Sequence, residues 1–342
     1  MKYAIGYQLP EEGEDTIVDI VRDYRDQVAE VYFPWTDMAS GRAALATRRG
    51  YTDWTAQQRL EADLRALRAL GVRLDLLFNA NCYGGYAMSE MLANQVTSLL
   101  EHLEDLVDGV DVVTTTSPFV AQVIKERFPG VETRASVNMR IGTVQGFSYV
   151  AHLFDDYYVL RDHNRDLGTI AALKEWADAN GKRLLMLVNS GCLYACSGQT
   201  FHDNLVAHER EADELARYPG FMPHTCWSLF GERARWPAFL QATWVRPEDV
   251  HHYADLFAVG KLATRMHAQP RMVVDAYARG THHGNLLDLM EPAYSRAYAP
   301  WVLMNDLFPE DWFARTSTCG RRCTACDYCA GVLERTLVRM EP

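Results

Sequence analysis

Cysteines are the residues of this sequence best suited to chemistry, and seven of the eight fall into two groups. The first group comprises Cys192, Cys196 and Cys226, and it begins shortly after the apolar run Leu184–Val188. The second group comprises four cysteines within the range 319–329. In a reducing compartment, grouped cysteines more often bind metal or do redox chemistry than form disulfides. The grouping therefore predicts thiolate-bound metal.

The first group is predicted to form one site with the eighth cysteine, Cys82. Cys82 follows the apolar run Leu74–Phe78, and Cys192 and Cys196 follow another such run. Loops that follow the strands of a parallel barrel meet at one face of it, and Cys226 belongs to a long segment that can fold over that face. Four thiolates there would suit a [4Fe-4S] cluster or a structural zinc. A lone cysteine such as Cys82 is equally typical of a small buried core residue.

The second group is the densest metal signal in the chain. Its members are separated by three, two and two residues, a spacing that resembles ferredoxin-type cluster loops and zinc knuckles. The first three also match the C-x3-C-x2-C signature of radical S-adenosylmethionine enzymes, but that signature follows an early barrel strand, whereas this one stands beyond the predicted barrel. The expected occupant is a second [4Fe-4S] cluster, with zinc as the alternative. The four residues are Cys319, Cys323, Cys326 and Cys329.

Amide and basic side chains follow several predicted strands and are candidates for binding substrate. The planar guanidinium of arginine binds carboxylates and phosphates through two parallel hydrogen bonds, so arginines at a barrel mouth suit an anionic substrate. For any one of them, a surface salt bridge with one of the many acidic residues is an equally good explanation. The candidates are Asn138, Arg140, Arg161, Asn189, Lys261 and Arg265.

The elements that must position these residues alternate between strand and helix. Short apolar runs are followed by stretches with apolar residues at helical spacing, such as 60–70, and a loop is expected from Gly41 to Asp53. Such alternation predicts an α/β protein with a parallel sheet, and the number of strands favours a closed (β/α)8 barrel of the TIM type. Seven predicted strands are Tyr3–Tyr7, Val31–Phe33, Leu74–Phe78, Val110–Thr114, Thr133–Val137, Tyr157–Leu160 and Arg183–Val188.

The eighth strand and the domain boundaries are less sharply marked. Either Ala242–Val245 or Gly260–Arg265 completes the barrel. The segment from about 192 to 241 breaks the alternation, and an insertion of this length after a barrel strand is typical of a lid or a site-forming segment. The chain is thus predicted to comprise a barrel over 1–284 and a C-terminal extension over 285–342 that carries the second cysteine group.

The composition is that of a globular protein able to bury a large core, with 48% hydrophobic and 23% charged residues. A net charge of -11 does not favour a surface dedicated to nucleic acid, which needs clustered Lys and Arg. No basic and apolar signal stands at the start, and no apolar run reaches the roughly 18 residues of a membrane span. We therefore expect a cytoplasmic protein without a membrane span that acts on a small-molecule substrate.

Several segments, taken in order, resemble one known family. They are Val31–Phe33 with Gly41 and Arg42, Ser136–Asn138, Val159–Arg161, Cys192–Gln199, Val245–Asp249 and Lys261–Arg265. Together they are similar to the peptidase U32 family of collagenase-like proteins. The similarity covers roughly residues 2 to 280, and the segment at the first cysteine group is its most specific part.

The resemblance implies a barrel that binds a [4Fe-4S] cluster through four cysteines. Members of the family support oxygen-independent hydroxylation of tRNA, ribosomal RNA or ubiquinone precursors. Residue matching implies Cys192 and Cys226 as cluster ligands and Arg161 and Arg265 as contacts to a substrate anion. This chain departs from the pattern because Thr200 stands where a second cysteine is usual. The four-cysteine extension is a further departure.

The leading hypothesis is an iron–sulfur enzyme that performs oxygen-independent hydroxylation, or related redox chemistry, on a small molecule or a nucleic-acid base at the barrel mouth. The second cluster would relay electrons between an electron donor and the first. Two alternatives stay open. One is a cysteine or metal-dependent peptidase, for which His224 near Cys226 is the suggestive base. The other is a non-catalytic, cluster-bearing subunit that pairs with a homologous chain.

Overall fold

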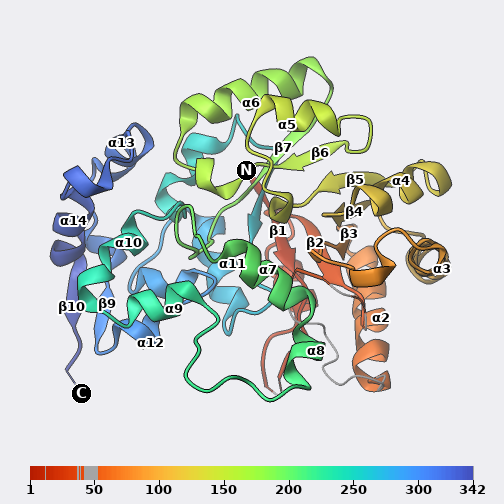
Figure 1. The fold of residues 1–342 in the computed structure, drawn as a ribbon, viewed down its shortest axis with the longest axis horizontal. Helices are drawn as coiled ribbons and strands as arrows, with labels where there is room; N and C mark the ends of the chain where they lie inside the picture. Colours follow the sequence, from red (N-terminus) through yellow and green to blue (C-terminus); the bar gives the residue numbers. More distant parts are fainter. Residues whose placement is uncertain (12, 37, 39, 42–52, 342) are drawn as a thin grey trace.

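Eight parallel strands close into one barrel in sequence order, with β1 paired to β8. The computed structural model describes residues 1–341 except 12, 37, 39 and 42–52 (Figure 1). The α/β class and the TIM-type barrel are confirmed, whereas most of the expected loop between Gly41 and Asp53, including Arg42, lies outside the described residues. The strands are β1 (Lys2–Gly6), β2 (Val28–Pro34), β3 (Arg73–Phe78), β4 (Val112–Thr115), β5 (Glu132–Ala135), β6 (Asp156–Tyr158), β7 (Arg183–Leu187) and β8 (Val259–Leu262).

Helices between the strands cover the outside of the barrel, each burying one apolar stripe. In α3 the side chain of Ser89 accepts a hydrogen bond from the backbone N–H of Leu92 and starts the helix. Leu92, Val96 and Leu103 recur at helical spacing and are buried, and the left-handed Asp108 ends the helix. These barrel helices are α1 (Ile17–Asp23), α2 (Trp54–Ala69), α3 (Glu90–Val107), α4 (Pro118–Arg127), α5 (Val144–Tyr149), α6 (Leu167–Ala179) and α11 (Pro270–Arg279).

The long insertion lies between β7 and β8. Of the two candidate runs for the eighth strand, Gly260–Arg265 overlaps β8. The other run, Ala242–Val245, is not a barrel strand. It lies beside the end of β7, where the backbone N–H of Val245 donates to the carbonyl of Val188 at 2.9 Å. The insertion contains four short helices, α7 (Gln199–Ala207), α8 (Glu209–Asp213), α9 (Thr225–Phe230) and α10 (Pro237–Leu240). No helix among the described residues has both the length and the apolar character needed to cross a membrane.

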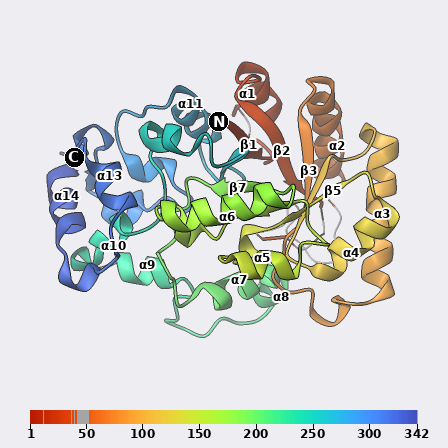
Figure 2. The ribbon, with the colours of Figure 1, turned by 90° about the horizontal axis from the view of Figure 1, so that it is seen from above.

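The C-terminal extension packs on the barrel through aromatic rings. Trp312 is buried and stacks on Trp244 with the ring centroids 5.8 Å apart, and Phe308 meets the same ring edge-on. Figures 1 and 2 place α13 and α14 on the side of the barrel opposite α2–α4. The tail cysteines are thereby held against the barrel. The elements are α12 (Ser295–Tyr298), β9 (Trp301–Leu303), α13 (Trp312–Ser317), α14 (Tyr328–Thr336) and β10 (Leu337–Arg339), with β9 and β10 antiparallel.

The interior of the barrel carries buried charges. Arg134 on β5 reaches Glu30 on β2 with Nη1 and Oε1 2.5 Å apart, and Asp75 on β3 with Nη1 and Oδ2 3.3 Å apart. Its Nη2 lies 3.2 Å from Oδ2 of Asp156 on β6. All four side chains are fully buried. Removing charges from water is costly unless they are paired, so this network fixes four strands to one another beneath the barrel mouth.

Candidate metal centre and anion-binding cavity

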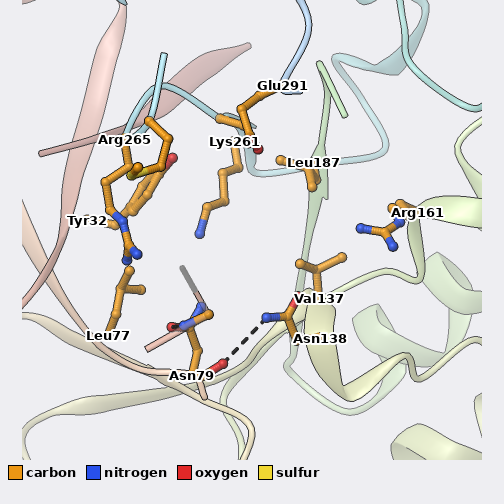
Figure 3. A pocket seen from close by; sticks show the side chains of 13 residues that line it. Tyr32, Leu77, Asn79, Val137, Asn138, Arg161, Leu187, Lys261, Arg265 and Glu291 are labelled. Carbon is orange, nitrogen blue, oxygen red and sulfur yellow. Dashed lines mark hydrogen bonds between the residues drawn. The ribbon is translucent and has the colours of Figure 1, made fainter. Parts of the chain in front are cut away.

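A small polar cavity opens where the strands end, at the barrel mouth (Figure 3). Its free volume of about 70 Å³ has room for a few waters or one small chemical group rather than a whole large substrate. The lining residues come from six strands or the loops that follow them, and from the extension. They are Tyr32, Gly41, Leu77, Asn79, Val137, Asn138, Arg161, Leu187, Lys261, Ala263, Arg265, Met266 and Glu291.

Lys261 is one of two buried cations that line this cavity in the described part of the chain, and Arg265 is the other. Its Nζ lies 3.8 Å from the centroid of the Tyr32 ring and 5.1 Å from that of Tyr158. Burial lowers the pKa of Lys261 to about 8, and the negative charge of Asp75 opposes that shift. Burial likewise raises the pKa of Asp75. At neutral pH the ammonium is therefore charged and poorly solvated, which favours an anion in the cavity.

Two arginines complete a cationic wall. Figure 3 shows Lys261 and Arg265 pointing into the cavity from β8 and its following loop, while Arg161 approaches from the loop after β6. Arg161 also donates through Nη2 to Oε1 of Gln199, which ties the cavity to the cysteine segment. Among the described lining residues, Glu291 supplies the opposing carboxylate. Three cations against one carboxylate make the wall suitable for a carboxylate or phosphate.

Amide side chains form the opposite edge of the cavity. Asn138 donates through Nδ2 to the backbone carbonyl of Asn79 at 3.4 Å, and both line the cavity. Two other predicted substrate residues do not line it. Arg140 is exposed, with a left-handed φ of 57°. Asn189 is fully buried, and its Oδ1 accepts from the backbone N–H of Ala263 at 2.6 Å. Asn189 therefore joins the end of β7 to β8 rather than contacting a ligand.

Three of the four thiols predicted for the first site, Cys192, Cys196 and Cys226, lie near enough to one another for their charges to interact, although in the described residues they do not converge on a single point. Burial raises the pKa of the Cys226 thiol on α9, and the neighbouring Cys192 and Cys196 raise it further. The hydroxyl of Tyr294 lies beside Cys226 and Cys192. That hydroxyl is buried, yet no described residue offers it a hydrogen bond of good geometry, and the same is true of Nδ1 of His224. The hydroxyl of Tyr294 is thus placed to interact with the Cys226 sulfur.

The loop that carries Cys192 and Cys196 is fixed at both ends. The backbone N–H of Gly191 donates to the carbonyl of Glu291 at 2.9 Å, so the loop is joined to the extension. Ala195 has a left-handed φ of 47°, and its N–H donates to Oδ1 of Asp162 at 3.1 Å. The left-handed conformation is uncommon for a residue other than glycine. The backbone therefore holds the two thiols in a defined turn beside the cavity.

Cys82 has different neighbours. The backbone N–H of Gly84 donates to its Sγ at 3.3 Å, and the imidazole of His208 lies beside the thiol. The interaction with His208, followed by that with Gly84, lowers the pKa of Cys82. His208 in turn lies with Nδ1 2.5 Å from Oε2 of Glu211. Cys82, His208 and Glu211 form a separate row of thiol, imidazole and carboxylate.

The four thiols of the second group line one cavity in the extension. It has a volume of about 500 Å³ and is half open to solvent, with Cys319, Cys323 and Cys326 exposed. Burial raises the pKa of Cys329 to about 11, Arg165 opposes the shift, and the other three thiols increase it. All eight cysteines of the chain are free thiols. The loop spacing thus does place the four side chains around a common space.

Several residues of these sites were not predicted from the sequence. Tyr294 and Glu291 belong to the range 285–342, which the sequence presented only as a tail, and their positions depend on its packing against the barrel. Tyr32 and Asn79 follow or belong to predicted strands. The end of β3 offered a signal for Asn79, since polar residues at the ends of barrel strands commonly face the site.

The chain is similar to a protein of known sequence and to several solved structures. The sequence matches no protein-family profile. It is 23% identical over 273 residues to a protein of Methanocaldococcus jannaschii described as an uncharacterized protease, covering 78% of this chain and 77% of that one. Among solved structures, a U32 peptidase aligns with a TM-score of 0.49 and 18% identity, over 65% of this chain and 82% of its own. A glycoside hydrolase family 5 mannosidase of Rhizomucor miehei aligns with a TM-score of 0.44 and 7% identity, over 82% and 90%.

The protein is an eight-stranded α/β barrel with thiols at its mouth and in its extension. Its resemblance to the peptidase U32 proteins, predicted from the sequence, agrees with the description of the Methanocaldococcus jannaschii relative as a protease.

Proposed function

We propose that the protein is an iron–sulfur enzyme that performs oxygen-independent hydroxylation, or a related redox reaction, on an anionic substrate at the barrel mouth. The observation that carries the proposal is the proximity of Cys192, Cys196 and Cys226 near the barrel mouth, where a cationic cavity opens. The buried hydroxyl of Tyr294 lies beside Cys226 and Cys192, so it can donate a hydrogen bond to a thiolate or to the sulfur atoms of a bound cluster. A cluster bound there would supply one-electron chemistry.

Other residues of the chain bind the substrate and hold it in position relative to the thiols. Lys261, Arg161 and Arg265 bind the anionic part of the substrate, because three cations meet there in a partly dry space. Gln199 links Arg161 to the cysteine segment, so the anion site and the thiols keep a fixed relation. Since the cavity admits only a small group, the bound anion is one end of the substrate and the reacting part extends toward the thiols.

The test is iron and acid-labile sulfide analysis of anaerobically purified protein, with electron paramagnetic resonance of the reduced sample. Cys192→Ser should remove about four irons, one cluster's content, together with its resonance. Cys82→Ser is the matched control and should keep them, because Cys82 interacts with His208. Unchanged iron in Cys192→Ser would overturn the proposal, and loss of iron from Cys82→Ser would make Cys82 the fourth ligand.

A second candidate function is thiol-dependent hydrolysis at Cys82. The specific observation is the row Cys82, His208 and Glu211, in which a base lies beside a thiol and a carboxylate holds the base. The pairing considered from the sequence, His224 with Cys226, is not formed in this way. Cys226 lies beside Tyr294, and the His224 ring packs edge-on against His202 at 4.7 Å.

Hydrolysis can be separated from redox chemistry with metal-free protein. The Cys82 thiolate would attack a substrate carbonyl, His208 would protonate the leaving group, and water would release the acyl product. Release of nitrophenol from an activated ester should fall at least about 100-fold in Cys82→Ala and His208→Ala. Cys226→Ala is the control and should retain the activity. An equal rate in wild type and Cys82→Ala would exclude this function.

A further inference from the structure

We infer that the C-terminal extension holds a second metal centre, a [4Fe-4S] cluster bound by Cys319, Cys323, Cys326 and Cys329. The inference stands apart from the proposed function, because it concerns a different cavity and different thiols. The four side chains come from a single loop and the start of α14, and all of them line the same half-open cavity. Four cysteine thiolates are a complete ligand set for such a cluster.

A buried cation, Arg165, lies close to the tail thiols and interacts with Cys329. Arg165 is buried and makes its hydrogen bonds to backbone carbonyls, with Nη2 2.7 Å from the carbonyl of Trp244 and Nη1 2.8 Å from that of Leu240. It forms no salt bridge within the part of the chain that the structure describes. Its guanidinium lies between two rings, 4.3 Å from the Trp244 centroid and 5.0 Å from that of Trp312. Because a buried cation is costly without an opposing charge, Arg165 favours negative charge on the nearby Cys329 in addition to that of Asp249.

Arg321 adds a second cation at the same place. It stands in the loop between Cys319 and Cys323 and lines the cavity. Nη1 of Arg321 donates to the carbonyl of Gln241 at 3.0 Å, but its Nη2 is buried without a partner among the described residues. Arg165 and Arg321 thus place two cations near the four thiols, and thiolates that bind a cluster would supply the opposing charge.

A cluster accounts for the thiol positions better than zinc does. In the described residues no three His, Cys, Asp or Glu side chains converge tightly enough to hold a single metal ion. A zinc ion needs all its sulfur ligands about 2.3 Å from one point, whereas a four-iron cluster binds each thiolate through a different iron and accepts more widely spaced sulfur atoms. The large cavity volume of about 500 Å³ agrees with the larger group.

The second centre is also in contact with the first cysteine loop. The Arg321 guanidinium lies 4.1 Å from the centroid of the Tyr194 ring. Tyr194 stands between Cys192 and Cys196, so one cation–π contact joins the two cysteine loops although about 125 residues separate them. Arg321 is therefore the positioning residue that connects the two sites.

The experiment counts metal in the full-length chain purified without oxygen. Wild-type protein should contain about eight irons if both clusters load. Cys326→Ser, an exposed position whose replacement leaves the core intact, and the combined replacement of all four tail cysteines by serine should each lose about four. Thr324→Ser in the same loop is the matched control and should lose none. Electron paramagnetic resonance of the reduced samples identifies which signal disappears.

Two outcomes would overturn the inference. One is the same iron content in the four-serine variant as in the wild type, and the other is one zinc per chain that the same variant removes. The barrel variant Cys192→Ser separates this result from the proposed function. If it retains about four irons while the four-serine variant has lost them, the tail centre stands whether or not the barrel thiols bind iron.

Discussion

The two thiol groups of this protein are assembled in different ways. Cys192 and Cys196 follow β7, whereas Cys226 comes from α9 in the insertion, and their polar neighbour Tyr294 comes from the extension. The tail thiols lie within eleven residues of one another in the sequence. The barrel group therefore depends on long-range packing, while the tail group depends mainly on local chain geometry. Changes in the barrel core should affect the first group far more than the second.

The two thiol groups also differ in how far they are exposed to solvent. Cys226 is buried, and the loop of its neighbour Cys192 is joined to Glu291, which lines the cationic cavity at the barrel mouth. Three of the tail thiols are exposed and lie beside arginines. An enclosed site can control what reaches its thiols, whereas an exposed site is accessible to a redox partner. The barrel group is accordingly the better place for substrate chemistry, and the tail group the better place for exchange with solvent or another protein.

The largest effect is expected from the charge network under the barrel mouth. Arg134→Met leaves Glu30, Asp75 and Asp156 buried without their common cation, which should lower the free energy of unfolding by about 3–5 kcal/mol. Urea denaturation measures this change. Arg183→Met is the control, because Arg183 pairs with Asp156 from a half-exposed position and should cost under about 1 kcal/mol. Equal losses in the two variants would contradict the view that the buried network holds the barrel site.

A smaller effect is expected when alanine replaces a glycine of the first cysteine loop. The same replacement in the second cysteine loop serves as the comparison. A Cβ on Gly191 would lie 2.5 Å from the backbone oxygen of Pro292, so Gly191→Ala should push the first loop from the extension. We expect a cost of about 1–3 kcal/mol and less iron at the barrel site. Gly320 in the tail loop has open space around it and no left-handed φ, so Gly320→Ala should change neither stability nor iron. Thermal unfolding measures the stability of both variants, and iron analysis measures how much metal each retains.

Most of the fold could be predicted from the sequence because the barrel repeats one local pattern. Runs such as Leu74–Phe78 are long enough and apolar enough to mark strands, and helical periodicity between them is clear. The eighth strand was ambiguous because β8 comprises only Val259–Leu262 and includes Lys261 and Gly260. Its apolar character is weak, and only closure against β1 and β7 identifies it.

The positions of residues at the barrel mouth could be predicted where they depend on strand ends, and not where they depend on distant packing. Strand-end positions alone placed Arg161 and Arg265 at the mouth, where both line the cavity. The same rule included Asn189, which is buried against Ala263 instead. The interaction of Cys82 with His208 depends on how the insertion folds over the loop after β3, and no local pattern records that.

The cavity beside the barrel thiols gives a prediction about pH. Lys261 has a pKa lowered to about 8 by burial, so its ammonium is present below that pH and is lost as pH rises through it. Affinity for sulfate, used as an anion probe, should therefore be highest near pH 6.5 and fall about 10-fold or more by pH 9.5, since a charged hydrogen bond contributes about 1.5–3 kcal/mol. Titration calorimetry measures the affinity.

Lys261→Met removes the titrating group and supplies the control. The variant should bind sulfate weakly at every pH, and its remaining affinity should not change between pH 6.5 and 9.5. A wild-type affinity that stays constant across this range would show that Lys261 does not carry the anion site. An unchanged pH dependence in Lys261→Met would assign the titration to another group.

The smallest effect concerns the single contact between the two cysteine loops. Tyr194→Leu removes the ring under Arg321 and should cost about 0.5–1 kcal/mol, the usual size of a partly exposed cation–π contact, or about 1–2 °C in Tm. Tyr218→Leu is the control at a largely exposed ring. Because either replacement could act through other neighbours, Arg321→Gln and the double variant complete a cycle that isolates the pair. A coupling energy near zero between Tyr194 and Arg321 would mean that the two loops only lie side by side. A coupling energy of about 0.5–1 kcal/mol would mean that each cysteine loop stabilises the other through this contact.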